Sequence, residues 1–337
     1  MSVKLSEIAN KTGVSISTVS RVLNNDMKKP ASAKTRDKIL EAARELGYFS
    51  SGSQAAPVQP AQHRIVCYLA SDTYTDNFFS RLLMGIQAEA DRRGYLIANS
   101  FSTANSSIDA VLNLVGDPST EGLILMGRVR RSLMTELKAR TSNIVYTGLN
   151  RTNAGIDEVV CDAYSAIRRS VRFLRDSGHT KIGFLGAIDD QKGEILNEHR
   201  FRAYSDEMTA LGLPIEKKYC KDIPLSTASA YEAMCEMLEA GNVPEALCCA
   251  NDNVAIGAIS ALNRYKLRVP EDVSVVGLDN IDTGMYFKPS LTTHEVHAKE
   301  LGGLALRLLS DRINGLHFTP LYVEMQSEII VRDSCRK

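Results

Sequence analysis

Polar side chains that can bind a small molecule lie at the ends of two strand-like segments in the second half of the chain. Asn251 and Asp252 end the segment 246–251 and open a helical one, and Asp279 ends the segment 273–279. Ligands of open parallel sheets bind at the carboxyl ends of the strands. Because carboxylate and amide groups exchange hydrogen bonds with neighbouring hydroxyls, these residues predict a site for a sugar-like molecule.

A second pattern lies near the amino terminus, in residues 13–24, GVSISTVSRVLN. At helical spacing the apolar face, which would pack on a small core, consists of Val14, Val19 and Val22 or Leu23. The opposite, exposed face consists of Ile16, Ser17, Ser20 and Arg21. Short side chains let a helix approach DNA closely, and Arg21 can bind guanine or phosphate. The pattern favours DNA recognition over an ordinary amphipathic helix with a solvated face.

Other reactive groups are arranged less favourably. Asp189 and Asp190 are adjacent, so their side chains point apart, and they lie in a loop-like run. The six histidines are scattered, and the seven cysteines form no CxxC pair, which is typical of buried, reduced thiols. The sequence contains neither a phosphate-binding loop motif nor a GxGxxG after a strand. We therefore predict no enzymatic activity, no metal site and no cofactor.

The elements that position the DNA-binding residues are three short helices, expected over 4–11, 15–24 and 32–46. Ser15 and Ser32 can cap the second and third helices, and Gly47 can end the third. The tight turn 12–14 contains a glycine, as a helix-turn-helix requires. Residues 50–62, SSGSQAAPVQPAQ, lack a hydrophobic period and read as a linker.

Beyond the linker, strand-like and helical segments alternate, which predicts parallel sheets covered by helices on both faces. The expected strands are 64–71, 95–102, 121–127, 143–148, 158–162, 181–187, 246–251, 273–279 and 322–331. These are too many for one sheet of ordinary size. We therefore expect two similar α/β lobes.

Charge is distributed unevenly along a chain of 337 residues with 40 basic and 40 acidic side chains. Residues 1–50 hold nine basic and five acidic groups, as expected of a small module that meets phosphates. No segment approaches the roughly 20 apolar residues of a membrane span, and the amino terminus lacks a signal-peptide core. We expect a cytoplasmic protein with no membrane partner.

Several of these segments together resemble the lactose-repressor/galactose-repressor family of transcription regulators. The segments are LSEIANKTGVS (5–15), TVSRVLN (18–24), SAKTRDKILEAARELGY (32–48), RRGY (92–95), EGLILMG (121–127), LRDSGHTKIGFLGA (174–187), ALCCANDNVAIGAISAL (246–262), LRVPEDVSVVGLDN (267–280) and PSLTTHEV (289–296). They cover almost the whole chain in the family's order.

The resemblance implies an all-α helix-turn-helix headpiece at 1–49, a linker at 50–62 and a core at 63–337. The core would be an α/β unit of two lobes, like periplasmic binding proteins, joined by three crossovers with a ligand cleft between them. Lobe 1 would comprise 63–162 and 292–320, and lobe 2 would comprise 163–291 and 321–337.

The residue patterns and the resemblance together give two sets of candidate site residues. The DNA-binding set is Ser15, Ile16, Ser17, Thr18, Ser20, Arg21, Asn24, Lys34 and Thr35. The effector-binding set is Phe78, Phe79, Asn197, Arg200, Phe201, Asn251, Asp252, Asp279 and His297. Asn197 stands where relatives commonly have an arginine, and Gly148 stands where an aspartate often follows the strand.

The linker departs from the family, because Pro57 lies about where many members place a leucine that wedges into the minor groove and bends the operator. The regulators of β-galactosidase and galactose genes include a subset that lacks this hinge, and DNFF (76–79) and EHRFRAY (198–204) look similar to that subset.

We expect a homodimeric repressor that reads a pseudo-palindromic operator and responds to a small effector, with carbohydrate as the main class and nucleobases or other metabolites open. No leucine heptad follows 322–331, which favours a dimer over a tetramer. The alternatives are a solute-binding module that has lost DNA binding, and an enzyme on the same fold.

Overall fold

A computed structural model describes residues 5–23, 32–46, 63–70, 77–102, 107–188 and 194–336. The chain divides into two compact units, residues 1–62 and 63–337. Asn24, Gly47, Asp189, Asp190 and the linker 50–62 lie outside the described residues.

The first unit contains the three helices expected of a helix-turn-helix headpiece: α1 (Leu5–Thr12), α2 (Ile16–Leu23) and α3 (Ala33–Glu45). The Ser15 hydroxyl accepts a hydrogen bond from the Thr18 amide at 3.2 Å, and Ser32 caps α3 in the same way. Gly13, with φ +70°, makes the turn that an L side chain would strain. Ile8, Val19 and Ile39 are fully buried and form the small core, as the predicted apolar face requires.

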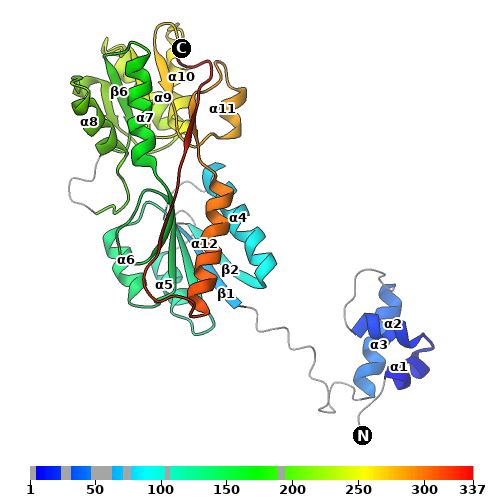
Figure 1. The fold of residues 1–337 in the computed structure, drawn as a ribbon. Coiled ribbons are helices and arrows are strands. Elements are labelled where there is room, and N and C mark those ends of the chain that lie inside the picture. The colour runs from blue at the N-terminus through cyan, green and yellow to red at the C-terminus, as the bar shows by residue number, and fades with distance from the viewer. Residues whose placement is uncertain are drawn as a thin grey trace. The chain divides into compact units, whose positions relative to one another are not determined.

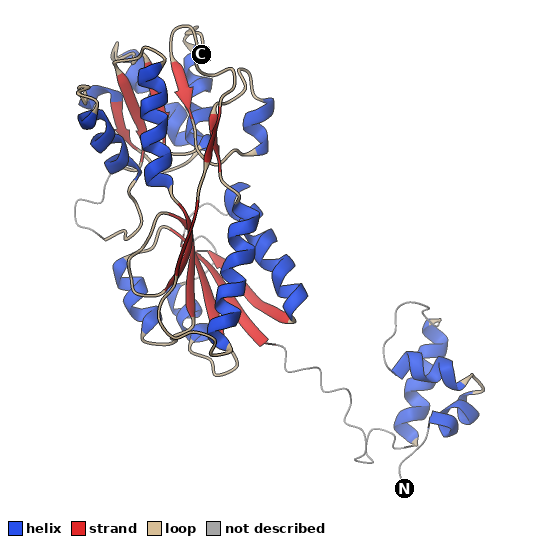
Figure 2. Ribbon diagram, viewed as in Figure 1, coloured by secondary structure: helices blue, strands red, loops and turns tan. Residues whose placement is uncertain are grey.

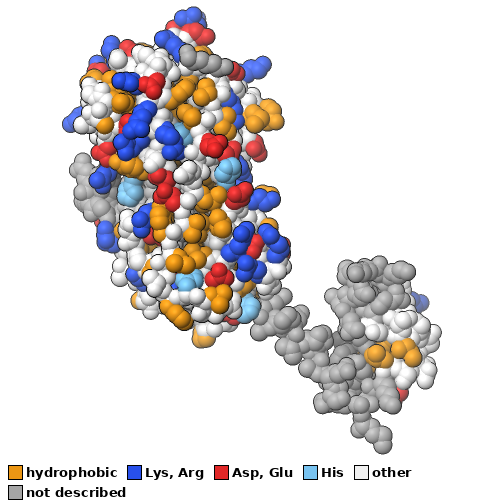
Figure 3. All heavy atoms as spheres, in the orientation of Figure 1, with side chains coloured by type: hydrophobic (Ala, Val, Ile, Leu, Met, Phe, Trp, Pro, Cys, Tyr) orange, Lys and Arg blue, Asp and Glu red, His pale blue; other side chains and the backbone are white. Residues whose placement is uncertain are grey.

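The second unit consists of two α/β lobes, each a parallel sheet between helices (Figures 1 and 2). On the face seen in Figure 3, acidic, basic and apolar side chains are interspersed over both lobes. No helix among the described residues is long and apolar enough to cross a membrane.

Lobe 1 is built on a six-stranded sheet of order β11-β5-β4-β3-β1-β2. Its strands are β1 (His63–Ala70), β2 (Tyr95–Ser102), β3 (Gly122–Gly127), β4 (Ile144–Leu149), β5 (Asp157–Cys161) and β11 (Tyr322–Met325). Helices α4 (Asn77–Arg93) and α12 (Ala298–Ile313) cover one face, and α5 (Ile108–Val115) and α6 (Arg131–Lys138) cover the other.

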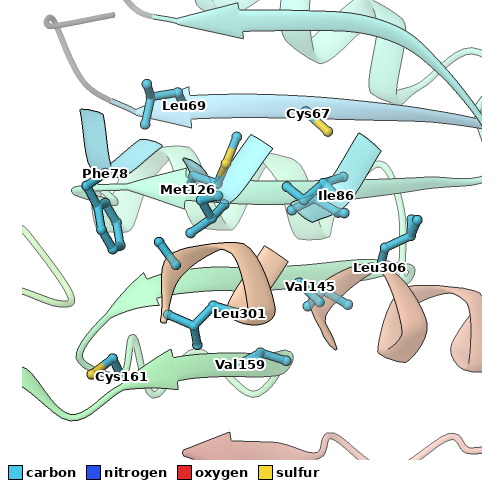
Figure 4. Close-up of a cluster of buried hydrophobic side chains, with 14 of the residues drawn as sticks. Cys67, Leu69, Phe78, Ile86, Met126, Val145, Val159, Cys161, Leu301 and Leu306 are labelled. Carbon is cyan, nitrogen blue, oxygen red and sulfur yellow. The ribbon is translucent and has the colours of Figure 1, made fainter. Parts of the chain in front are cut away.

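The core beneath α4 and α12 is apolar and closely packed. In Figure 4, Cys67, Leu69 and Met126 of the sheet meet Phe78 and Ile86 of α4 and Leu301 and Leu306 of α12. A Cβ atom at Gly85 would lie 1.9 Å from the Lys299 carbonyl oxygen, and one at Gly302 would lie 2.1 Å from that of Leu82. Glycine is therefore required where the two helix backbones touch.

Lobe 2 is built on a four-stranded parallel sheet of order β7-β6-β8-β9. Its strands are β6 (Ile182–Gly186), β7 (Cys220–Asp222), β8 (Ala246–Cys249) and β9 (Ser274–Val276). Helices α7 (Ala163–Asp176) and α8 (Arg200–Ala210) pack on one face, and α9 (Thr227–Glu239) and α10 (Asp252–Arg264) pack on the other. The short helix α11 (Asp282–Tyr286) and a 3-10 turn, η1 (Lys217–Tyr219), complete the lobe.

The chain crosses between the lobes three times: after β5, at β10 (Thr293–Glu295) and at β12 (Glu328–Ile330). Strands β10 and β12 pair antiparallel. The boundary expected after residue 320 requires correction, because β11 pairs with β5 in the sheet of lobe 1. Lobe 1 therefore extends to Met325, and the single strand expected over 322–331 is divided between that sheet and the crossover.

All seven cysteines are unpaired, and five of them are buried. Burial raises the pKa of the Cys67, Cys161 and Cys335 thiols to about 12. These thiols therefore remain protonated at neutral pH and pack as small apolar groups.

Candidate functional site

A cleft of about 580 Å³, partly open to solvent, lies at the carboxyl ends of the strands of both lobes. Lobe 1 contributes Phe78, Phe79, Gly127, Arg128, Tyr146, Gly148, Leu149 and Asn150. Lobe 2 contributes Asn197, Arg200, Leu225, Asn251 and Asp279. Six of the nine predicted effector-binding residues are thus brought together from both lobes.

The lobe 1 wall contains three aromatic residues, Phe78, Phe79 and Tyr146. Phe78 and Phe79, in the first turn of α4, meet edge to face with ring centroids 5.1 Å apart. Phe78 belongs to the core and is 4% exposed, whereas Phe79 is partly exposed. A Cβ atom at Gly148, where φ is +155°, would lie 2.7 Å from the Tyr146 hydroxyl. That hydroxyl therefore excludes a larger residue at position 148 in this conformation.

The lobe 2 wall carries a buried ion pair at the start of α8. The Arg200 guanidinium donates to Glu198 from Nε at 2.8 Å and also from a terminal nitrogen. It donates to the Ala250 carbonyl at 3.2 Å, and Arg128 Nε lies 3.3 Å from the same glutamate. Burial alone would raise the pKa of Glu198, but the two arginines hold it below its ordinary value. Arg200 is thereby fixed as a cation at the edge of the cleft.

Asn251 and Asp279 complete the lobe 2 wall. Asn251 caps α10 through its side-chain oxygen, which accepts from the Val254 amide at 2.9 Å. Asp279 has φ +119°, an unusual value for a residue other than glycine, and its amide donates to the His294 carbonyl. The polar groups that follow two adjacent strands thus converge on one cleft.

Three predicted effector residues do not line this cleft. Asp252 is fully buried and accepts hydrogen bonds from Thr293 Oγ1 at 2.6 Å and the Ile281 amide at 2.9 Å. Phe201 packs against Phe184 and Tyr204 in the core of lobe 2. The His297 side chain is 49% exposed, at the amino terminus of α12. Their effector contacts remain predictions.

Sequence reasoning missed six lining residues, Gly127, Arg128, Tyr146, Leu149, Asn150 and Leu225, and noted Gly148 only as a departure from the family. Gly127, Arg128, Leu149 and Asn150 lie at the ends of β3 and β4, so the rule that located Asn251 could have located them too. Tyr146 lies within a strand, and no local pattern separates it from core residues.

In the headpiece, the α2 residues whose exposure is described include exposed ones in its first turn. Ile16 is 53% exposed, and Ser15 and Ser17 are exposed and joined through their hydroxyl oxygens at 2.9 Å. The Thr18 hydroxyl lies 2.8 Å from that of Ser15, and Ser20 is half-buried. Arg21 lies in α2, while Lys34 is exposed and Thr35 half-buried in α3. The described members of the predicted DNA-binding set thus lie along α2, just before it at Ser15, and in the first turn of α3.

Two family models match the chain. Residues 4–51 match the model described as bacterial regulatory proteins, lacI family, and residues 171–335 match a periplasmic binding protein-like domain.

Curated relatives match over nearly their whole length. The transcriptional repressor MelR of Bacillus subtilis is 28% identical, with 99% of this chain and 97% of MelR aligned. The transcriptional repressor CytR of Escherichia coli is 29% identical, with 98% of this chain and 96% of CytR aligned. These matches do not test the narrower resemblance to regulators that lack the hinge.

Solved structures share the fold. A complex of the regulator CelR with cellobiose has a TM-score of 0.73 at 22% identity, covering 98% of this chain and 99% of CelR. A Lac repressor dimer bound to operator has a TM-score of 0.72 at 24% identity, covering 99% of each chain. The chain therefore has a headpiece of the lacI family of bacterial regulatory proteins at residues 4–51, followed by a periplasmic binding protein-like domain, and over its full length it is similar to transcriptional repressors.

Proposed function

We propose that this protein is a cytoplasmic repressor that binds a pseudo-palindromic operator as a homodimer and releases or tightens its hold when a carbohydrate enters the cleft. MelR, CytR and the PurR proteins of Vibrio species are named transcriptional repressors, which supports the repressor assignment. The Lac repressor dimer bound to operator supports the dimer and the DNA partner. Light scattering on the purified chain should give the mass of two subunits; the mass of four would contradict the dimer.

The observation that carries the effector class is the chemistry of the two cleft walls. Phe79 offers a ring face that can cover the apolar face of a pyranose, and Arg200, Asn251 and Asp279 offer donors and acceptors opposite it. The CelR–cellobiose complex and the Lac repressor bound to ONPG support a sugar. A flat nucleobase would also fit against a phenylalanine ring, so nucleobases form the second class to test.

The operator is found by selecting sheared genomic DNA on the purified protein and sequencing what is retained. We expect one pseudo-palindrome to be enriched. Arg21→Ala should lower affinity for that fragment by about 1–3 kcal/mol and relax specificity at one base position. The matched control is Lys38→Ala, which removes a cation from an exposed site of α3 outside the predicted contact set and should leave sequence preference unchanged.

If the protein were a solute-binding module without DNA function, no sequence would be enriched and Arg21→Ala would affect no activity.

The effector class is tested separately by isothermal titration with cellobiose, other mono- and disaccharides, and nucleobases. Binding of a sugar supports the proposal, whereas binding of a nucleobase alone would replace carbohydrate as the effector class.

A further inference from the structure

A short segment of lobe 2 lies against lobe 1 at one side of the cleft. Residues 194–197 precede α8, yet they run antiparallel to residues 129–131, which join β3 to α6. The Leu196 amide donates to the Val129 carbonyl at 2.9 Å, and the Arg131 amide donates to the Glu194 carbonyl at 2.8 Å. The Leu196 side chain packs on the apolar cluster beneath α5 and α6 of lobe 1. The two lobes are therefore joined here by backbone as well as side chains.

The Asn197 side chain extends this junction. Its Oδ1 accepts from the Val129 amide at 3.0 Å, and its Nδ2 donates to the Gly127 carbonyl at 2.8 Å and to the Tyr146 hydroxyl at 2.5 Å. An amide nitrogen has two donor hydrogens, and lobe 1 accepts both. Asn197 is 6% exposed, so although it lines the cleft it has no donor left for an effector.

We propose that Asn197 is a positioning residue, a latch that holds the lobes in the closed arrangement, and that it does not bind the effector. Gly127 and Tyr146, which accept its hydrogen bonds, both line the cleft. The latch stabilises the closed state. An effector held between the two walls would stabilise that same state. Effector affinity then depends on the fraction of molecules already closed, which the latch sets. This last consequence rests on the proposed function; the latch itself does not.

Closure can be measured without effector or DNA. Arg130 and Ile195 face each other between the two backbone hydrogen bonds. Such non-hydrogen-bonded pairs have Cα atoms about 4.5 Å apart, within the range that a disulfide spans. In the full chain carrying Arg130→Cys and Ile195→Cys, the rate of disulfide formation at a fixed concentration of oxidised glutathione, which takes up the two electrons as it is reduced to glutathione, reports how often the lobes are closed. Cys220→Ala and Cys235→Ser remove the two native thiols that are not fully buried.

In this background we expect Asn197→Ala to slow disulfide formation about tenfold, because the closed state loses three hydrogen bonds. Asn197→Asp retains the acceptor for Val129 but places a carboxylate oxygen against the Gly127 carbonyl, so it should slow disulfide formation at least as much. The matched control is Asn113→Ala, which removes the same group from an exposed site of α5 and should leave the rate unchanged.

Equal rates for the Asn197 variants and the control would overturn the proposal, as would a background that forms no disulfide. Circular dichroism shows whether each variant is folded. If Asn197→Ala is unfolded, the rate of disulfide formation in Asn197→Asp is compared with that of the control instead. The disulfide experiment contains no ligand, so its result does not depend on whether the effector class is right. The effector titration likewise does not depend on whether Asn197 acts as a latch.

Discussion

The two walls of the effector cleft differ in what else their residues do. On the lobe 2 wall, Arg200 neutralises the buried Glu198, and Asn251 caps a helix. On the lobe 1 wall, the apolar ring of Phe79 is partly exposed and packs at the edge of the core. Lobe 2 therefore presents polar groups that also stabilise the fold, whereas the Phe79 ring is only partly buried and leaves part of its surface open to the cleft.

This contrast predicts that substitutions in lobe 2 mainly affect folding, while substitution of Phe79 mainly affects binding. Preorganised polar groups give orientation and specificity, and a ring adds contact area. Three substitutions test the contrast.

The largest expected effect is that of Arg200→Ala. Removing Arg200 leaves the buried Glu198 with only the partly exposed Arg128 to compensate its charge, so the free energy of unfolding should fall by about 3 kcal/mol in urea titrations. Arg202→Ala, on the same helix with a side chain 76% exposed, should change it little. Adding Glu198→Gln to Arg200→Ala should recover part of the loss. An Arg200→Ala protein as stable as the wild type would show that the pair is not needed for folding.

Substitution of Asp252 tests whether this lobe 2 carboxylate, unlike Asp279, stabilises the fold without lining the cleft. Asp252→Ala leaves the Thr293 hydroxyl and Ile281 amide without their acceptor and should reduce the free energy of unfolding by about 2 kcal/mol. Effector affinity should be unchanged, because Asp252 does not line the cleft. Loss of binding without loss of stability would instead place Asp252 in the effector site.

The same residue predicts a pH dependence. Burial raises the pKa of Asp252 from 3.8 to about 6, so the folded state binds this proton more tightly than the unfolded state. Its contribution to stability is therefore largest below about pH 4 and is lost as the pH rises through 6. Relative to Asp252→Asn, the wild type should gain stability as the pH falls from about 7 to about 4.5. A difference independent of pH would contradict the shift.

The smallest effect on stability is expected for Phe79→Ala. It should weaken effector binding about tenfold in titration calorimetry, since it removes the ring that we propose covers the ligand. The free energy of unfolding should change by less than about 1 kcal/mol, because the side chain is only partly buried. Phe78→Ala is the contrasting variant: this ring belongs to the core, and its loss should destabilise the protein by about 3 kcal/mol.

Much of the fold was predictable because it depends on local patterns. The helix caps at Ser15 and Ser32 and the apolar spacing of α2 suffice for the headpiece, and alternating strands and helices indicate the two lobes. The position of β11 was not predictable, because the apolar run 322–331 does not show where the chain leaves one lobe for the other.

The site was predictable only in part. Strand ends located Asn251 and Asp279, and family resemblance added Phe78, Phe79 and Arg200. Asn251 and Asp252 are neighbours, yet one side chain lines the cleft and the other enters the core, a difference set by the partners that Thr293 and Ile281 provide from distant parts of the chain. The two hydrogen bonds that Asn197 Nδ2 donates to lobe 1 likewise depend on contacts between lobes.

The central claim is that a ligand in the cleft controls binding to the operator. Its most direct test is the affinity for the selected operator fragment, measured by fluorescence anisotropy with and without the sugar identified by calorimetry. We predict a change of at least about fivefold, the lower range of allosteric coupling. The change should be smaller in Phe79→Ala at the same sugar concentration. An operator affinity that stays constant while the sugar saturates the cleft would contradict the account, because a ligand that binds both states equally shifts neither.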